Sequence, residues 1–139
     1  MTNWIKISYE RNQYVIDLDR VSAFVSEQNG TLKFWLPDSG FPIVLNPQGN
    51  PEAHQKVLAY IEQVRGQIFD DYWIEINYER NTYLVNLKCI SSFASEANGR
   101  ITFWLPDGAI AIIINPQSNK EDYQKVINYI QRATGHSLP

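Results

Sequence analysis

The residues that most often carry out chemistry are few and widely spaced in this chain. It contains two histidines, His54 and His136, and one cysteine, Cys89. A nucleophilic triad needs a histidine and a carboxylate close to the nucleophile, and a zinc site needs several nitrogen, sulfur or carboxylate ligands at close spacing. Neither histidine has a second candidate ligand at helical or hairpin spacing. Asp70 and Asp71 are adjacent carboxylates that solvation explains. The sequence predicts no catalytic residue, no metal site and no cofactor.

The glycines also give no sign of phosphate chemistry. There are seven, and they are spread over predicted turns and helix ends rather than gathered in one phosphate-binding loop. We therefore predict a non-enzymatic protein. One alternative stays open, an enzyme or small-ligand binder with a pocket between two halves of the chain. Its candidate lining residues are His54, Tyr60, Tyr123 and Asp70.

Composition and charge restrict the class of partner. Hydrophobic residues make up 44% of the 139 residues and charged residues 19%, which is a globular balance. The net charge of −3 disfavours nucleic-acid binding, because phosphate attracts basic surfaces. The N-terminal residues lack the apolar core of a signal peptide, and the longest apolar run, Ala109 to Ile114, is far shorter than a membrane span. We expect a cytoplasmic protein with no membrane contact.

The sequence of residues 4–66 recurs at residues 73–135, and 32 of the 63 aligned pairs are identical. We call two residues that are 69 positions apart counterparts; Trp4 and Trp73 are one such pair. The repeat predicts two domains, 1–68 and 69–139. Units of this size are near the lower limit for a stable core, and the connection at 67–72 has no flexible Gly/Ser/Pro run. We therefore expect the two units to pack as one globule.

Each unit is predicted to contain five short antiparallel strands. Apolar residues alternate with polar ones in the first, second and fourth strands, which is typical of half-buried strands. Asn29-Gly30 predicts a type I′ hairpin turn, because both residue types tolerate positive φ angles. In the first unit the strands are expected at Trp4 to Tyr9, after a turn at Glu10-Arg11-Asn12 around Tyr14, Ile16 and Leu18, at about Val21 to Glu27, at Leu32 to Leu36, and at Ile43 to Leu45, with the last strand of the second unit at Ile110 to Ile114.

A helix is predicted at the end of each unit. Asn50 and its counterpart Asn119 are expected to cap the helix N-termini with their side chains. Apolar residues at helical spacing follow, and Gly66 and Gly135 stand where the helices should end. The predicted fold class is α+β, two tandem β-β-β-β-β-α units related by a pseudo-two-fold axis.

This order of strands and helix resembles the second half of bacterial pleckstrin-homology-like domains. It is also similar to small antiparallel-sheet DNA-binding domains of the LytTR type. The resemblance lies in the pattern of hydrophobic and turn positions, and it extends loosely over each unit.

Four tryptophans need more than a core explanation. Strand alternation places Trp4, Trp35, Trp73 and Trp104 on the sheet face that lies away from the helix of their own unit. Large aromatic side chains on an outer face mark a contact surface. The two units could bury these faces against each other, which we favour, or the faces could bind another molecule.

Two further retained sets are candidates for the same interface. Arg11 and Arg80 lie in the first turn of each unit, and either they form salt bridges with Glu27 and Glu96 or all four charges are solvated. On the helices, Lys and Tyr four residues apart share a flank, where they cover the edge of the core or bind a partner. These helix residues are Lys56 and Tyr60, with their counterparts Lys125 and Tyr129.

The main hypothesis is a protein-interaction or scaffold module, whose partner is another protein or a second copy of the chain. The alternative from another class is a nucleic-acid-binding domain. It would use Trp35 and Trp104 as stacking platforms and Lys33, Arg100 and Arg11 as phosphate contacts.

Overall fold

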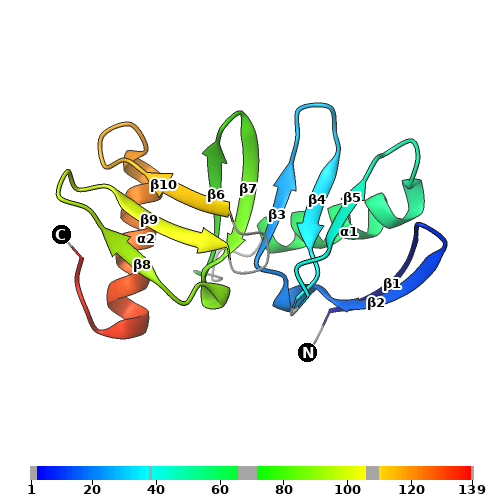
Figure 1. The fold of residues 1–139 in the computed structure, drawn as a ribbon, viewed down its shortest axis with the longest axis horizontal. Helices are drawn as coiled ribbons and strands as arrows, with labels where there is room; N and C mark the ends of the chain where they lie inside the picture. Colours follow the sequence, from blue (N-terminus) through cyan, green and yellow to red (C-terminus); the bar gives the residue numbers. More distant parts are fainter. Residues whose placement is uncertain (1–2, 38, 66–71, 106–109, 139) are drawn as a thin grey trace.

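The α+β class is confirmed in the computed structural model, which describes residues 3–37, 39–65, 72–105 and 110–138. The elements run in the same order in both halves of the chain (Figure 1). The first half contains β1 (Trp4–Tyr9), β2 (Asn12–Asp17), β3 (Ala23–Ser26), β4 (Leu32–Trp35), β5 (Pro42–Leu45) and α1 (Pro51–Arg65). The second contains β6 (Trp73–Tyr78), β7 (Asn81–Asn86), β8 (Phe93–Ser95), β9 (Ile101–Leu105), β10 (Ile110–Ile114) and α2 (Lys120–Thr134).

The five strands of one half do not form a sheet of their own. The central sheet has the order β5-β4-β3-β7-β6, so it combines three strands of the first half with two of the second. The hairpin β1-β2 and the three-stranded sheet β10-β9-β8 remain separate. These two sheets lie toward opposite ends of the long axis of the molecule (Figure 1).

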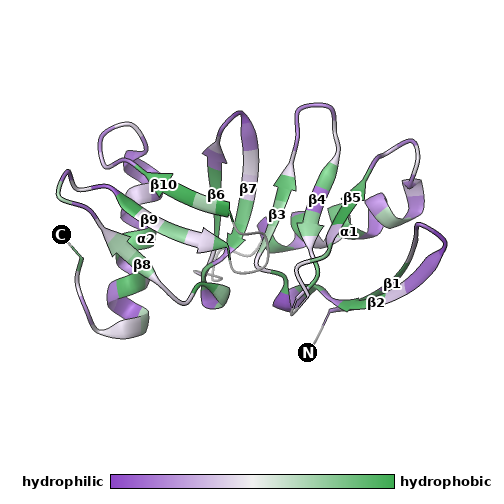
Figure 2. Cartoon of the chain, in the orientation of Figure 1, coloured by the Kyte–Doolittle hydropathy of each residue, from purple (hydrophilic) through white to green (hydrophobic). Residues whose placement is uncertain are grey.

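Two hydrophobic cores form on this framework, and each includes residues of both halves. The first contains most of the buried hydrophobic side chains of the first half together with Trp73 and Leu84. The second contains those of the second half together with Ala23, Val25 and Trp35. Figure 2 shows hydrophobic residues concentrated in the strands and hydrophilic residues in the connecting turns. Because the strands of the central sheet contribute side chains to both cores, the halves share their buried surface.

A short 3-10 helix follows the second strand of each half, and the strand pattern did not predict it. Asp17 Oδ1 accepts a hydrogen bond from the Asp19 backbone N–H at 3.1 Å, and Asn86 Oδ1 accepts from Lys88 N–H at the same distance. Short Asp and Asn side chains compete with sheet pairing in this way. Leu18, predicted as the end of a strand, therefore lies in a 3-10 turn (Leu18–Arg20) but is buried as expected.

The predicted type I′ turn at Asn29-Gly30 is wrong. Only Gly30 has a positive φ, of 90°, and the Asn29 side chain accepts a hydrogen bond from Thr31 N–H at 3.0 Å. The paired positive φ angles occur instead at Glu10 and Arg11, with φ of 48° and 70°. Two residues join β1 to β2, and such short connections need this geometry to match the twist of the strands.

Both predicted helices are present, but the predicted capping of α2 is wrong. The side chain of Asn119 makes no capping hydrogen bond to the described residues of the first helical turn. Its Oδ1 instead accepts a hydrogen bond from Asn115 N–H at 3.2 Å. Asn50 likewise accepts from Asn46 N–H at 3.2 Å. These side chains therefore stabilise the turn before each helix. Gly135 ends α2 with a φ of 78°, as predicted, whereas its counterpart Gly66 lies outside the described residues.

Candidate functional site

The two halves are joined by antiparallel pairing of β3 with β7, which we call the junction. Phe24 lies opposite Leu84, and Val25 lies opposite Tyr83. This pairing is what extends the β5-β4-β3 sheet by the β7-β6 hairpin. All four of these side chains are buried, so the junction belongs to the hydrophobic interior.

An aromatic cluster covers one face of the junction. The ring of Phe24 lies 6.0 Å from that of Trp73 and 5.8 Å from that of Tyr60, and the rings of Tyr60 and Trp73 are 6.2 Å apart. The Tyr60 hydroxyl donates a hydrogen bond of 2.5 Å to Asp19 Oδ1. Burial raises the pKa of Tyr60 well above its ordinary value, and the bond to Asp19 raises it further. Tyr60 therefore remains a neutral donor that fixes α1 against the junction.

The opposite face of the junction is covered by Trp35. Its side chain shares the second core with Tyr83 and Val85 of β7. Lys33 Nζ stands 5.2 Å from the centre of the Trp35 ring, within the range of a cation–π contact. Packing across the junction therefore uses one tryptophan from each half, Trp73 on one face and Trp35 on the other.

Polar contacts complete the junction. The backbone N–H of Asn86 donates to the Ser22 carbonyl at 2.8 Å, and its side-chain amide donates to the Asp19 carbonyl at 3.0 Å. Arg65 of α1 forms an ion pair of 3.3 Å with Glu75 of β6. This last pair is half-exposed and contributes little, whereas Asn86 is buried and its hydrogen bonds define the register.

The four tryptophans divide into two buried and two exposed. Trp73 and Trp35, at the junction, are 8% and 5% exposed. Their counterparts Trp4 and Trp104 are 55% and 46% exposed. Each half therefore exposes one tryptophan whose counterpart is buried against the other half.

An aliphatic pair shows the same difference. Val15 of β2 is 64% exposed, and its counterpart Leu84 of β7 is 4% exposed. This difference between counterparts is not general among outward strand residues, since Val44 and its counterpart Ile113 are alike at 40% and 37% exposed. The Val15 and Leu84 positions differ because Leu84 lies at the junction, whereas neither Val44 nor Ile113 does.

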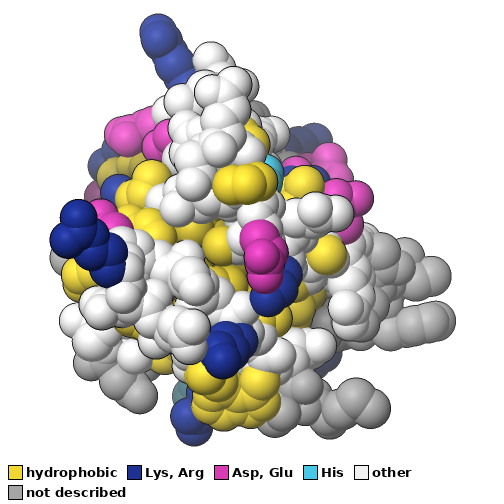
Figure 3. All heavy atoms as spheres, turned by 90° about the vertical axis from the view of Figure 1, so that its right-hand side faces the viewer, with side chains coloured by type: hydrophobic (Ala, Val, Ile, Leu, Met, Phe, Trp, Pro, Cys, Tyr) yellow, Lys and Arg dark blue, Asp and Glu magenta, His cyan; other side chains and the backbone are white. Residues whose placement is uncertain are grey.

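These positions form two surfaces. The β2 surface consists of Trp4, Tyr14 and Val15, and the β8 surface consists of Phe93, Ala94 and Trp104. β2 pairs with β1 alone and β8 with β9 alone among the described strands, so each surface borders a sheet edge. The end of the molecule that carries β1 and β2 faces the viewer in Figure 3, where hydrophobic side chains reach the surface between polar ones. An open strand edge beside apolar side chains is suited to pairing with another strand.

Tyr14, Val15, Phe93 and Ala94 were not among the sequence-predicted interface residues. A signal was present, because an apolar residue occupies the outward position between Tyr14 and Ile16, and its counterpart Leu84 is apolar too. Polar residues are expected at outward positions of a strand with one solvated face. An apolar residue there in both halves indicates a second buried face.

The retained arginines have a structural explanation. Arg80, like Arg11, lies in a two-residue hairpin turn at a positive φ of 70°. The predicted pairing of arginine with glutamate is wrong in the second half, since Glu96 Oε2 accepts from Arg100 at 3.0 Å and Oε1 from Thr102 at 3.0 Å. The Thr102 hydrogen bond, followed by that of Arg100, lowers the pKa of Glu96 below its ordinary value. Neither Arg11 nor Arg80 forms an ion pair with any described residue.

The two helix flanks differ. Lys56 Nζ donates to the Lys6 carbonyl at 2.8 Å and pairs with Glu52 at 3.3 Å, so it ties α1 to β1. Lys125 pairs with Glu121 at 3.8 Å. Tyr60 is buried at the junction, but its counterpart Tyr129 is half-buried, 6.5 Å from the ring of Phe93. The flank of α2 thus lies beside the β8 surface.

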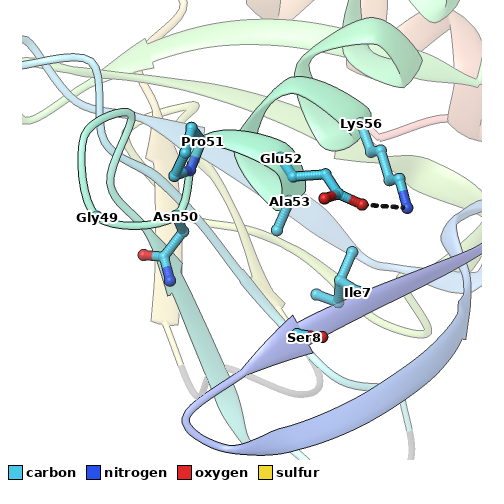
Figure 4. A pocket seen from close by; sticks show the side chains of 8 residues that line it. All are labelled: Ile7, Ser8, Gly49, Asn50, Pro51, Glu52, Ala53 and Lys56. Carbon is cyan, nitrogen blue, oxygen red and sulfur yellow. Dashed lines mark ion pairs between the residues drawn. The ribbon is translucent and has the colours of Figure 1, made fainter.

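Three small hollows are each lined by residues of one half. Figure 4 shows one of about 170 Å³ between β1 and the start of α1, with Ile7 and Ala53 on its walls and the Glu52–Lys56 ion pair at its rim. A hollow of about 480 Å³ lies at the counterpart position around Asn119. The third, of about 240 Å³, lies against β2 and is lined by residues that include Trp4 and Leu36. The first and third are smaller than usual ligand pockets.

The candidate chemical residues are not brought together. His54 Nε2 lies 2.7 Å from the Gly30 carbonyl within the first half, and Tyr60 is engaged by Asp19. Asp70 lies outside the described residues. Within the described ranges no group of three or more His, Cys, Asp or Glu side chains could hold a metal ion. Neither α1 nor α2, the helices of the described chain, is long and apolar enough to cross a membrane.

Comparisons with protein-family models, with curated proteins and with solved structures found no match to this chain. The resemblance to pleckstrin-homology-like and LytTR-type domains therefore rests on the order of elements alone.

Proposed function

We propose that this chain is a non-enzymatic protein-interaction module, which binds polypeptide through its β2 and β8 surfaces. One observation carries the proposal. Trp4, Val15 and Trp104 are exposed, and all three have counterparts that are buried by protein at the junction. The sequence already makes one protein contact at the junction, and it presents each side of that contact once more, at an open strand edge.

The nucleic-acid alternative has weaker support. Trp35, one of its two stacking platforms, is buried in the second core, and Lys33 lies over that ring rather than on an open surface. Trp104 keeps an exposed ring, yet a single platform on an acidic chain lacks the basic groove that strand binding uses.

The test is capture of bound protein from an extract of the native cell by the tagged full chain. We expect the wild type to retain protein, and we expect Val15→Lys to lose it, because a lysine on an open strand edge blocks strand addition.

Val44→Lys is the matched control, since Val44 is also an exposed valine in a strand but its counterpart is equally exposed. The control should capture as the wild type does. Equal capture by wild type and Val15→Lys, or no specific capture by either, contradicts the proposed function.

A further inference from the structure

We propose that the partner at these surfaces is a second copy of this chain, bound by antiparallel pairing of β8 of one copy with β2 of the next. The inference rests on the proposed function and names its partner. It is carried by the junction, which shows how the third strand of one half pairs with the second strand of the other. The counterparts of these two strands, β8 and β2, are left at sheet edges toward opposite ends of the molecule.

The junction also predicts the register of the contact. Phe24 lies opposite Leu84 and Val25 opposite Tyr83. If two chains pair in the same way, Phe93 of one chain lies opposite Val15 of the next, and Ala94 lies opposite Tyr14. The result is a second five-stranded sheet, with the order β10-β9-β8 continued by β2-β1 of the neighbour.

The counterparts of the junction's aromatic cluster are divided between the two surfaces. Phe93 packs on Tyr129 at 6.5 Å, as Phe24 packs on Tyr60 at the junction. The third member at the junction is Trp73, whose counterpart Trp4 is exposed on the other surface. Association would place Trp4 of one copy against Phe93 and Tyr129 of the other.

A hollow on the β2 surface fits the second exposed tryptophan. The hollow of about 240 Å³ is lined in part by Tyr14, Ile16 and Leu36. Their counterparts share a core with Trp35, the counterpart of Trp104. We therefore expect Trp104 of one copy to enter this hollow of the next, which would bury both exposed tryptophans in a single contact.

One polar contact of the junction is not repeated. At the junction the side-chain amide of Asn86 donates to the Asp19 carbonyl. The counterparts are Asp17 and Lys88, and a carboxylate cannot donate to a carbonyl, so the contact between two copies lacks this hydrogen bond.

The two surfaces differ, so the contact is head-to-tail. Such contacts close into a ring when the rotation between copies allows it and otherwise continue into a filament. Either assembly contains the same β8–β2 pairing.

Sedimentation of the purified full chain at about 100 μM tests the proposal, since a complex with a micromolar dissociation constant is populated there. We expect the wild type and Val44→Lys to sediment as multimers and Val15→Lys to sediment as a monomer. Val15 is exposed, so its substitution leaves the fold intact, and circular dichroism checks this. A monomeric wild type overturns the proposal.

Cysteine cross-linking then tests the register. On a Cys89→Ser background, one chain carries Val15→Cys and a second carries Phe93→Cys. We expect a short bifunctional thiol reagent to link the mixed chains, and we expect no link when Val44→Cys replaces Val15→Cys. Links of equal yield for both pairs, or for neither, overturn the register.

The two proposals fail separately. If the wild type is monomeric but Val15→Lys still abolishes capture of a different protein, self-association is wrong and the interaction module stands. If the wild type is monomeric and capture does not depend on Val15, both are wrong.

Discussion

Trp73 and Trp4 begin β6 and β1 at counterpart positions, yet one is buried at the junction and the other is exposed at an end. The local sequences are nearly the same, and both residues lie in a strand of a two-residue hairpin. The difference is that β7 has β3 beside it, whereas β2 has no neighbour on its outer edge among the described strands. Burial here is thus a property of the neighbouring half and not of the strand.

Separating the two halves should have the largest effect on the burial of Trp73. A fragment of residues 70–139 keeps β6 and β7 but loses β3, so Trp73 and Leu84 lose their partners in the first core. We expect the fragment to lack a cooperative unfolding transition or to dimerise, as followed by circular dichroism and analytical ultracentrifugation. A stable monomer would show that the junction is dispensable.

Truncating Trp73 and Trp4 measures how much the difference in burial contributes to stability. Trp73→Ala should lower the free energy of unfolding by about 3–5 kcal/mol, because it leaves a cavity among Phe24, Tyr60 and Leu84. Trp4→Ala should change the stability of the monomer by about 0.5 kcal/mol, as is usual for exposed positions. Urea unfolding at low protein concentration measures both. Equal losses would mean that Trp4 is packed as tightly as Trp73.

The two helix tyrosines give a smaller contrast. Tyr60→Phe removes the donor to the Asp19 carboxylate and should cost about 1.5 kcal/mol. Tyr129→Phe should cost less than about 0.5 kcal/mol, because the Tyr129 hydroxyl has no hydrogen bond to a described residue. Chemical denaturation of both variants and the wild type decides whether this hydrogen bond holds α1 at the junction.

The smallest expected effect concerns Glu96. Its pKa is lowered in the folded state, so its contribution to stability is present above the ordinary value of 4.5 and is lost as the pH falls through the folded-state pKa. Glu96→Gln should therefore be slightly less stable than the wild type at neutral pH and equal to it in acid. Glu27→Gln is the control, because Glu27 pairs with no described residue through its side chain. A pH-independent difference at Glu96 would contradict this assignment.

Much of the local structure could be predicted from the sequence. The strand positions, the two helices and the αL end of α2 at Gly135 follow from periodicity and from residue types with strong conformational preferences. Turn type was less predictable. Asn29-Gly30 lies in the five-residue connection between β3 and β4, and the paired positive φ angles fall on Glu10 and Arg11, because the pairing of the flanking strands decides the loop length.

The repeat and the strand alternation were enough to predict two similar units whose tryptophans lie away from their own helices. They could not determine which of those tryptophans are buried. Residues that lie outward in one strand become interior when another strand pairs at that edge, as Leu84 does beside Phe24. Strand pairing between distant segments is set by packing and hydrogen bonding of the whole chain. The alternation of residues along one strand does not specify which other strand pairs with it. Only the tertiary structure therefore separated Trp35 and Trp73, buried at the junction, from Trp4 and Trp104, exposed at the ends.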